Sequence, residues 1–275
     1  MKPLKQAIND YAGGQAQALA KHLKASGISC WSDCTKANLA DFRDALTSEV
    51  APSSAKTYIA VLKAILARYE DEGIIPCKTF REVLKVKNDK PVKAFLSTGE
   101  LERLMQVPTR TSNEIFVLYS FLVGAFTGMR VSDARAVSSE NISNDTLSYV
   151  SIKTGVHATI PVGERVKGYI EYLRANDSDM TLVTYNDIIR RLCKRAGLTE
   201  RVKVRHGGKD AVKEKWECVS SHTARISFAT NLAIAGLPMI DLSRLCGHTS
   251  TQMSERYVAQ HEVKLNDRAM AYFNI

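Results

Sequence analysis

The sequence predicts a mainly α-helical chain with small β-hairpins, an α+β fold organised as two domains. Most of the chain repeats its apolar residues at the spacing of an amphipathic helix. The period changes to two only around residues 147–162, which indicates a pair of short strands. A polar, basic stretch with one proline, residues 86–94, has the composition of a linker. It separates a helical N-terminal domain, residues 1–85, from a larger domain, residues 95–275.

Three helices are expected in the N-terminal domain. The first ends at Gly27, because glycine accepts the left-handed conformation that closes many helices. The second is expected to begin at Asn38, a candidate N-cap residue. The third is strongly amphipathic and runs from the break at Pro52 to Gly73.

The larger domain opens with a capping box formed by Ser97 and Glu100, which predicts a helix start. Residues 115–126 are apolar almost all round, so they are expected to form a buried central helix that delivers Arg130 at its end. The predicted strands flank a turn that contains Lys153. Residues 199–217 are charged and irregular, which leaves a second hairpin and a loop as alternatives. Further helices are expected at 166–173, at 188–196 and from 221 onward.

The composition is that of a soluble intracellular protein. The chain has 275 residues, of which 45% are hydrophobic, and it lacks the ~18 consecutive apolar residues of a membrane span. Its six cysteines have neither a CxxC pair nor the spacing of a zinc site, so free thiols are expected. The net charge of +9 favours a polyanionic partner, because Lys and Arg displace counterions from phosphates.

Four residue groups in the larger domain supply cationic and nucleophilic side chains in a fixed order. Together they provide two guanidiniums, an ammonium, two imidazoles and a phenol without a cluster of acids. This set can hold a phosphodiester and attack it with a tyrosine, without a metal. The groups are Thr127-Gly128-Met129-Arg130, Lys153-Thr154-Gly155, His222-Thr223-Ala224-Arg225, and Gly247-His248 with Tyr257 nine residues on.

Arginine suits a phosphodiester because its planar fork makes two parallel hydrogen bonds and stays charged. Arg130 directly follows an apolar helix, where a solvated arginine has no reason to be. Asp133, three residues on, can bond its guanidinium and fix the orientation. His222 and Arg225 are three residues apart and share a helix face.

The order and spacing of these groups resemble the tyrosine recombinases, also called the phage integrase family, strongly over residues 95–260 and more loosely before them. The resemblance implies a helical core-binding domain followed by a tyrosine-recombinase catalytic domain, which together clamp duplex DNA. It implies that Tyr257 attacks the DNA to give a 3′-phosphotyrosyl intermediate and that Lys153 is the general acid. The remaining catalytic residues would be Arg130, His222, Arg225 and His248, with Asp133 in support and with no cofactor or metal.

The group that activates Tyr257 stays open between His222, His248 and electrostatic stabilisation of the phenolate on substrate binding. The resemblance further implies homo-oligomers, a tetrameric synapse on paired sites, with accessory DNA-bending factors as a further class of partner and the nucleoid as the place of action. The apolar end of the chain, residues 269–273, would dock on a neighbouring protomer. Two alternatives are a type IB topoisomerase-like strand transferase and a non-catalytic DNA-binding regulator with the same fold.

Overall fold

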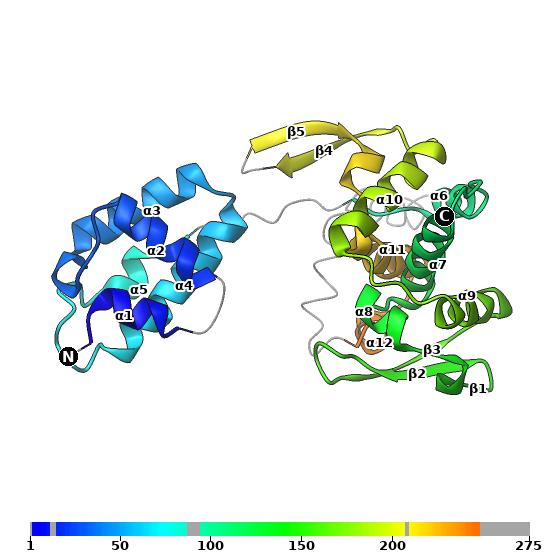
Figure 1. The fold of residues 1–275 in the computed structure, drawn as a ribbon, viewed down its shortest axis with the longest axis horizontal. Helices are drawn as coiled ribbons and strands as arrows, with labels where there is room; N and C mark the ends of the chain where they lie inside the picture. Colours follow the sequence, from blue (N-terminus) through cyan, green and yellow to red (C-terminus); the bar gives the residue numbers. More distant parts are fainter. Residues whose placement is uncertain (1, 12–14, 87–93, 207–208, 248–275) are drawn as a thin grey trace, which may run out of the picture. The chain divides into compact units, whose positions relative to one another are not determined.

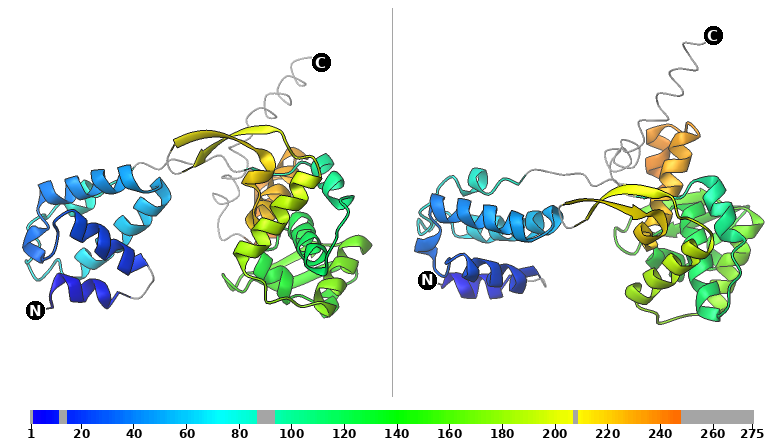
Figure 2. Two further views of the ribbon diagram at one scale, coloured as in Figure 1. Left: turned by 45° about the horizontal axis from the view of Figure 1, so that its top comes forward. Right: turned by 90° about the horizontal axis from the view of Figure 1, so that it is seen from above.

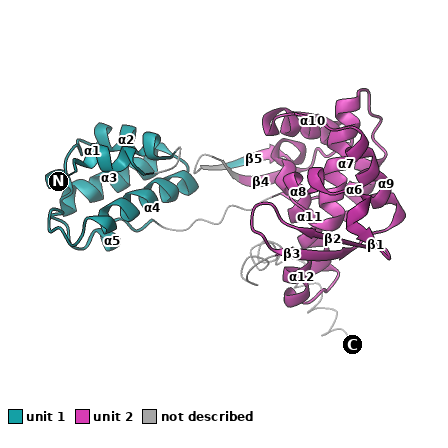
Figure 3. Ribbon diagram, turned by 60° about the horizontal axis from the view of Figure 1, so that its bottom comes forward, with its two compact units in different colours: residues 1–91, 205–211 teal, residues 92–204, 212–275 magenta. Residues whose placement is uncertain are grey.

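A computed structural model describes residues 2–11, 15–86, 94–206 and 209–247 of the chain (Figures 1 and 2). Most of the predicted linker, residues 87–93, lies outside the described residues. The chain divides into two compact units, which Figure 3 colours separately. Unit 1 contains residues 1–91 and 205–211, and unit 2 contains residues 92–204 and 212–275.

Within residues 2–86 of unit 1, the regular structure of the described part is helical, whereas residues 205, 206 and 209–211 belong to a β-hairpin that is described below with unit 2. The helices of unit 1 enclose one apolar core, in which Leu19, Phe42 and Leu62 are fully buried. The three predicted helices are present as α2, α3 and α4. The helices α1 and α5 were not predicted, because six and four residues are too short to establish a periodicity. The elements are α1 (Leu4–Asn9), α2 (Gln15–Ala25), the 3-10 helix η1 (Trp31–Asp33), α3 (Lys36–Glu49), α4 (Pro52–Arg68) and α5 (Phe80–Val83).

The start of α3 corrects one prediction. The N-cap residue is Thr35, whose hydroxyl accepts the backbone N–H of Asn38 at 3.2 Å. Asn38 therefore lies inside the first turn rather than before it. Its side chain donates to the carbonyl oxygen of Asp33 at 2.8 Å, so it binds the preceding loop instead of capping the helix.

Unit 2 is mainly helical with two small antiparallel sheets, which confirms the predicted fold class (Figure 1). Its helices are α6 (Thr98–Met105), α7 (Ser112–Thr127), α8 (Val131–Ala136), α9 (Glu164–Ala175), α10 (Leu182–Arg195), α11 (Ser221–Ile234) and α12 (Met239–Leu245). The 3-10 helices are η2 (Ser139–Asn141) and η3 (Lys215–Cys218). The strands are β1 (Ile142–Ser143), β2 (Thr146–Val150), β3 (His157–Pro161), β4 (Arg201–His206) and β5 (Lys209–Glu214).

Helix α7 is the central element of unit 2, as its all-round apolar sequence predicts. Phe121, Leu122 and Val123 on successive sides of the helix are fully buried. Helices α8, α9, α10 and α11 pack against it. Because α7 is covered on several sides, the segment that follows its C-terminal end starts from a rigid support.

The sheet β1-β2-β3 is antiparallel, and it contains the predicted hairpin around Lys153. Tyr149 of β2 pairs with Ala158 of β3, and Leu147 pairs with Ile160. These four side chains are buried and form the inner face of the sheet. Because side chains alternate along a strand, the next odd-numbered position, Ser151, is also expected on this inner face.

Strands β4 and β5 form a second sheet, so residues 199–217 contain a hairpin rather than an irregular loop. No helix in the described part of the chain is long and apolar enough to cross a membrane.

Candidate active site

Arg130 follows α7 at a point where the backbone conformation depends on a glycine. The helix ends at Gly128, whose φ of 70° is the left-handed conformation that favours this residue. A Cβ atom there would lie 2.6 Å from the ring of Phe228 on α11. Glycine therefore permits both the sharp end of α7 and the close approach of α11, two residues before Arg130.

The Arg130 side chain is mostly buried and reaches the inner face of the first sheet. Its Nη1 donates to the Ser151 hydroxyl at 2.9 Å, and this hydroxyl donates to Oδ2 of Asp133 at 3.1 Å. The nearest direct approach of Arg130 to Asp133 is 3.9 Å, an ion pair that is too long for a hydrogen bond. The expected pairing of Arg130 with Asp133 therefore depends largely on a serine that the sequence analysis did not single out.

The same aspartate also holds the turn that contains Lys153. Its second oxygen, Oδ1, accepts the backbone N–H of Ile152 at 2.9 Å. Across the base of the turn, the N–H of Ser151 donates to the carbonyl oxygen of Val156 at 2.9 Å. Lys153 lies in the turn between β2 and β3, as predicted, and its side chain is exposed.

Arg225 has the most enclosed position of the predicted cations, because its side chain is only 1% exposed. One guanidinium nitrogen donates to the carbonyl oxygen of Gly128 at 2.7 Å, and another donates to that of Cys246. Gly128 is two residues before Arg130, and Cys246 is two residues before His248. A single buried guanidinium thus joins the two chain segments that lead to Arg130 and to His248.

Gly247 places the end of α12 beside the first sheet. It adopts a left-handed φ of 57°, and a Cβ atom there would lie 3.5 Å from Ala158 and 3.7 Å from Val156. The segment leading to His248 therefore lies against the start of β3, on the hairpin whose turn contains Lys153. His248 and Tyr257 themselves lie outside the described residues, as do residues 269–273.

His222 lies in the first turn of α11 and is exposed, whereas Arg225 one turn later is buried. The start of the helix is fixed on both sides. Thr223 accepts the backbone N–H of Ser220 at 2.9 Å, and Asn186 of α10 accepts the N–H of Ser221 at 2.8 Å. His222 is thereby presented at the solvent-facing end of a firmly held helix.

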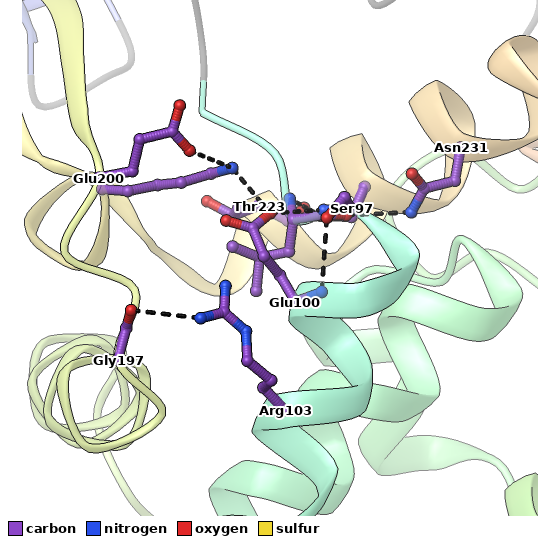
Figure 4. Close-up of polar contacts among 10 residues, drawn as sticks. Ser97, Glu100, Arg103, Gly197, Glu200, Thr223 and Asn231 are labelled. Atoms are coloured by element: carbon purple, nitrogen blue, oxygen red, sulfur yellow. Dashed lines mark hydrogen bonds and ion pairs between the residues drawn. The ribbon is translucent and has the colours of Figure 1, made fainter.

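Helix α11 is also fixed along its length by the first residues of unit 2 (Figure 4). The backbone N–H of Leu96 donates to the Ser227 hydroxyl at 2.8 Å, and the carbonyl oxygen of Leu96 accepts from the Asn231 amide at 3.0 Å. Ser227 and Asn231 are one turn apart on α11. The chain entering α6 is therefore held along the helix that contains His222 and Arg225.

A buried ion pair reinforces this attachment. The ammonium of Lys215 in η3 donates to Glu100 at 2.7 Å, and both residues are less than 10% exposed. Glu100 also accepts the backbone N–H of Ser97 at 2.7 Å, in the capping box that was predicted. Glu200 lies 3.9 Å from the same ammonium (Figure 4). Removal of either partner would leave the other as an unpaired buried charge, which is strongly destabilising.

The two guanidiniums act on the same buried region. Burial raises the pKa of the Tyr149 phenol, and the positive charge of Arg225 opposes that rise. Burial also raises the pKa of the Cys246 thiol to about 11, against the charges of Arg225 and Arg130. Because both arginines influence Cys246, their charges lie within electrostatic reach of one point in the interior.

The structure thus brings together Arg130, Asp133, Arg225 and the Lys153 turn, with His222 at the solvent-facing end of α11. Two fixed cations of this kind can stabilise charge that develops on the non-bridging oxygens of a phosphodiester. Within the described residues, no group of three or more His, Cys, Asp and Glu side chains is arranged to hold a metal ion.

Ser151 is the residue that the sequence analysis missed. Its signal was present, because Leu147 and Tyr149 mark the inward-facing positions of β2 and Ser151 continues that register. A polar side chain at a buried strand position requires a hydrogen-bond partner. That requirement can draw attention to the residue before its partner is known.

Comparison with known proteins gives the family. The phage integrase family model matches residues 94–263. A tyrosine recombinase XerC from Oceanobacillus iheyensis is 24% identical over 274 residues, which cover 90% of this chain and 83% of that protein.

Solved structures share the fold at low sequence identity. A lambda integrase dimer bound to a COC′ core site matches with a TM-score of 0.69 and 17% identity, covering 93% of this chain and 95% of that one. A lambda integrase tetramer bound to a Holliday junction matches with a TM-score of 0.63 and 17% identity, covering 92% and 74%. The family model spans more than half of the chain, and so this protein belongs to the phage integrase family, the tyrosine recombinases, which are enzymes that break and rejoin DNA.

Proposed function

We propose that the protein is a site-specific DNA recombinase, or integrase, in which Tyr257 is the nucleophile. The phenolate oxygen of Tyr257 would attack a backbone phosphorus, and the bond from that phosphorus to the 5′ oxygen would break. The product is a 3′-phosphotyrosyl enzyme and a free 5′ hydroxyl. The 5′ hydroxyl of another strand then attacks the same phosphorus and releases the tyrosine, so the phosphodiester is restored without ATP.

Arg130 and Arg225 would hold the non-bridging oxygens during both steps. The observation that carries this proposal is the buried position of Arg225, whose guanidinium joins the segments before Arg130 and His248. Cations that are fixed before the substrate arrives do not need to reorganise when charge develops in the transition state. Asp133 supports the arrangement through its contacts with Ser151 and Ile152.

Lys153 would protonate the leaving 5′ oxygen. Its exposed position in a turn, with the base of that turn hydrogen-bonded to Asp133, suits an ammonium that must reach a bound DNA strand. His222 and His248 would complete the site. The base that activates Tyr257 remains a choice between these two imidazoles and stabilisation of the phenolate by the bound substrate.

We further propose that residues 1–85 form a DNA-binding domain, that residues 86–94 link it to the catalytic domain 95–275, and that the enzyme acts on duplex DNA of the nucleoid as an oligomer. The net charge of +9 supports a nucleic-acid partner. The lambda integrase structures of similar fold are a dimer on a core site and a tetramer on a Holliday junction. Accessory DNA-bending factors are a further class of partner for such an assembly.

The direct test uses a nicked suicide substrate, in which the released 5′ end diffuses away and traps the covalent intermediate. The DNA comes from selection of bound sequences from a random library. The wild type should give a protein–DNA band on a denaturing gel, with a phosphate on Tyr257 by mass spectrometry. The Tyr257→Phe variant should give no such band while its gel-shift affinity is unchanged.

A band that survives in Tyr257→Phe would assign the nucleophile to another residue. The absence of a band from the wild type on selected sites would favour the non-catalytic regulator instead. A wild type that relaxes supercoils without exchanging paired sites would favour the topoisomerase-like alternative.

A further inference from the structure

The hydroxyl of Ser151 connects two functional elements of the site that differ in chemistry. One element is the guanidinium of Arg130, and the other is the turn that contains Lys153. We propose that Ser151 is a positioning residue that holds the Arg130 guanidinium and the Lys153 turn in a fixed relative position. Arg130 can then bind the phosphate while Lys153 protonates the leaving oxygen. The inference rests on the proposed roles of Arg130 and Lys153.

The first step of the argument is the hydrogen-bond chain through the hydroxyl. Arg130 donates to Ser151 Oγ at 2.9 Å, and Ser151 donates to Asp133 Oδ2 at 3.1 Å. A hydroxyl has one proton and two lone pairs, so it can accept the first bond and donate the second simultaneously. Because Arg130 and Asp133 approach each other directly only to 3.9 Å, the serine is the tighter connection between them.

The second step is the position of Ser151 at the base of the turn. Its carbonyl oxygen accepts the N–H of Gly155 at 2.8 Å, and its N–H donates to the carbonyl oxygen of Val156 at 2.9 Å. The backbone of Ser151 therefore closes the turn in which Lys153 lies. A displacement of the Ser151 side chain would be transmitted to this turn through the same residue.

The third step is that Asp133 holds the turn a second time. While Oδ2 accepts from the Ser151 hydroxyl, Oδ1 accepts the N–H of Ile152 at 2.9 Å. One carboxylate thus binds two consecutive residues immediately before Lys153. Ser151 is 3% exposed and Asp133 is 1% exposed, so water is largely excluded as a substitute partner.

A serine whose only role was to provide hydrogen bonds for buried polar groups would need no particular position relative to Lys153. The proposal instead requires that loss of the hydroxyl weakens both functions, the phosphate clamp and the proton transfer. The second function can be isolated chemically. When sulfur replaces the bridging 5′ oxygen, the leaving thiolate needs no proton, and the contribution of a general acid disappears.

The experiment compares Ser151→Ala with Ser148→Ala on a suicide substrate and on its 5′-bridging phosphorothiolate form. Ser148 is the matched control, because it lies on β2 three residues before Ser151 and its hydroxyl is 3.4 Å from that of Thr159. Ser151→Ala should cleave ordinary DNA about 100-fold more slowly, the scale expected for a misplaced reacting group. Part of that loss should disappear on the sulfur substrate, and Ser148→Ala should cleave both like the wild type.

Two further variants protect the test against a folding defect. Ser151→Cys has nearly the same shape but a weak hydrogen-bonding group, so it should fold like the wild type and still cleave slowly. In Ser151→Ala combined with Lys153→Ala, the loss should be smaller than the product of the two separate losses, because the alanine at 151 has already displaced the lysine. Melting temperature and gel-shift affinity of each variant report the fold independently.

Three results would overturn the proposal. The first is that Ser151→Ala cleaves at the same rate as Ser148→Ala. The second is that the cleavage rate of Ser151→Ala falls by the same factor on both substrates, which would confine its effect to Arg130. The third is fully multiplicative losses in the double variant. Covalent trapping by the wild type in the same gels tests the proposed function separately, so a failure of Ser151 alone would leave that function standing.

Discussion

The guanidinium of Arg195 makes two hydrogen bonds to the carboxylate of Glu114, at 2.9 and 3.0 Å, and joins α10 to the start of α7. Glu114 also accepts the backbone N–H of Arg110 at 2.8 Å. Chiefly because of Arg195, the pKa of this buried carboxyl is lowered to about 2. The central helix of unit 2 is thus stabilised by a charge that acid removes.

We expect this pair to make unit 2 sensitive to acid. The folded-state pKa of Glu114 lies below its ordinary value of 4.5, so its stabilisation is complete above about pH 4.5 and is lost as the pH falls toward 2. The shift corresponds to on the order of 3 kcal/mol. Glu114→Gln should therefore be less stable than the wild type at pH 7 in urea denaturation, and the difference should shrink toward pH 2. Glu171→Gln, on the exposed face of α9, is the control and should show neither effect.

Arg130→Lys and Arg225→Lys should each slow cleavage by about 10²- to 10³-fold, the cost of losing one donor that stabilises the transition state. Lysine keeps the charge but cannot make two parallel hydrogen bonds. Arg244→Lys is the control, since Arg244 is an exposed residue of α12. Single-turnover cleavage of a suicide substrate measures the rates, and calorimetry identifies any loss of fold at the buried position 225. A near-normal rate for Arg130→Lys would contradict the clamp.

Lys153→Ala should be slow on ordinary DNA and close to the wild type on a 5′-bridging phosphorothiolate, because a thiolate leaves without a proton. Thr154→Ala changes the next exposed residue of the same turn and should behave like the wild type on both substrates. If Lys153→Ala lost the same factor on both, the lysine would bind the phosphate rather than protonate the leaving oxygen.

Lys215→Met should destabilise unit 2 by about 3–5 kcal/mol, because it leaves the buried carboxylate of Glu100 without its ammonium. Lys213→Met, two residues earlier and more exposed, is the control and should have little effect. In the double variant with Glu100→Met, much of the loss should be recovered, since no charge then remains buried. Urea denaturation of the four proteins gives the free energies of unfolding. Equal destabilisation by the single and double variants would show that packing dominates at this site.

Thiol alkylation should discriminate between Cys30 and Cys246. Cys30 is exposed, whereas Cys246 is buried and its pKa is raised to about 11, so little thiolate forms at neutral pH. With N-ethylmaleimide at pH 7.5, mass spectrometry should find Cys30 labelled first and Cys246 protected. Denaturation should remove the difference. Rapid labelling of Cys246 in the native protein would mean that the end of α12 opens readily.

Much of the architecture could be predicted from the sequence, because strong periodicities and capping residues report local structure. The buried helix α7, the Ser97 capping box and the hairpin around Lys153 all follow from neighbouring residues. The start of α3 was placed wrongly because Thr35 and Asn38 both suit a cap. In the structure the Thr35 hydroxyl accepts the backbone N–H of Asn38, while the Asn38 side chain binds the carbonyl oxygen of Asp33 in the preceding loop.

The site was less predictable, because its contacts join residues that are distant in the chain. Arg225 was expected to face a phosphate, and its acceptors on Gly128 and Cys246 depend on how α7, α11 and α12 pack. Ser151 and the Lys215–Glu100 pair have the same origin. These contacts join positions 18 to 115 residues apart, which no spacing rule connects, and a backbone carbonyl acceptor cannot be recognised from the residue type.

The acceptors that fix Arg225 belong to the main chain, and this bears on how the protein can evolve. A carbonyl oxygen is present whatever the side chain, so position 246 can vary without removing the acceptor. Position 246 is limited to side chains that fit its buried surroundings, and position 128 is restricted more strongly, because a Cβ atom there would lie 2.6 Å from the ring of Phe228. The architecture around the arginine can therefore drift widely in sequence while its geometry persists, consistent with relatives that share only about a quarter of their residues with this chain.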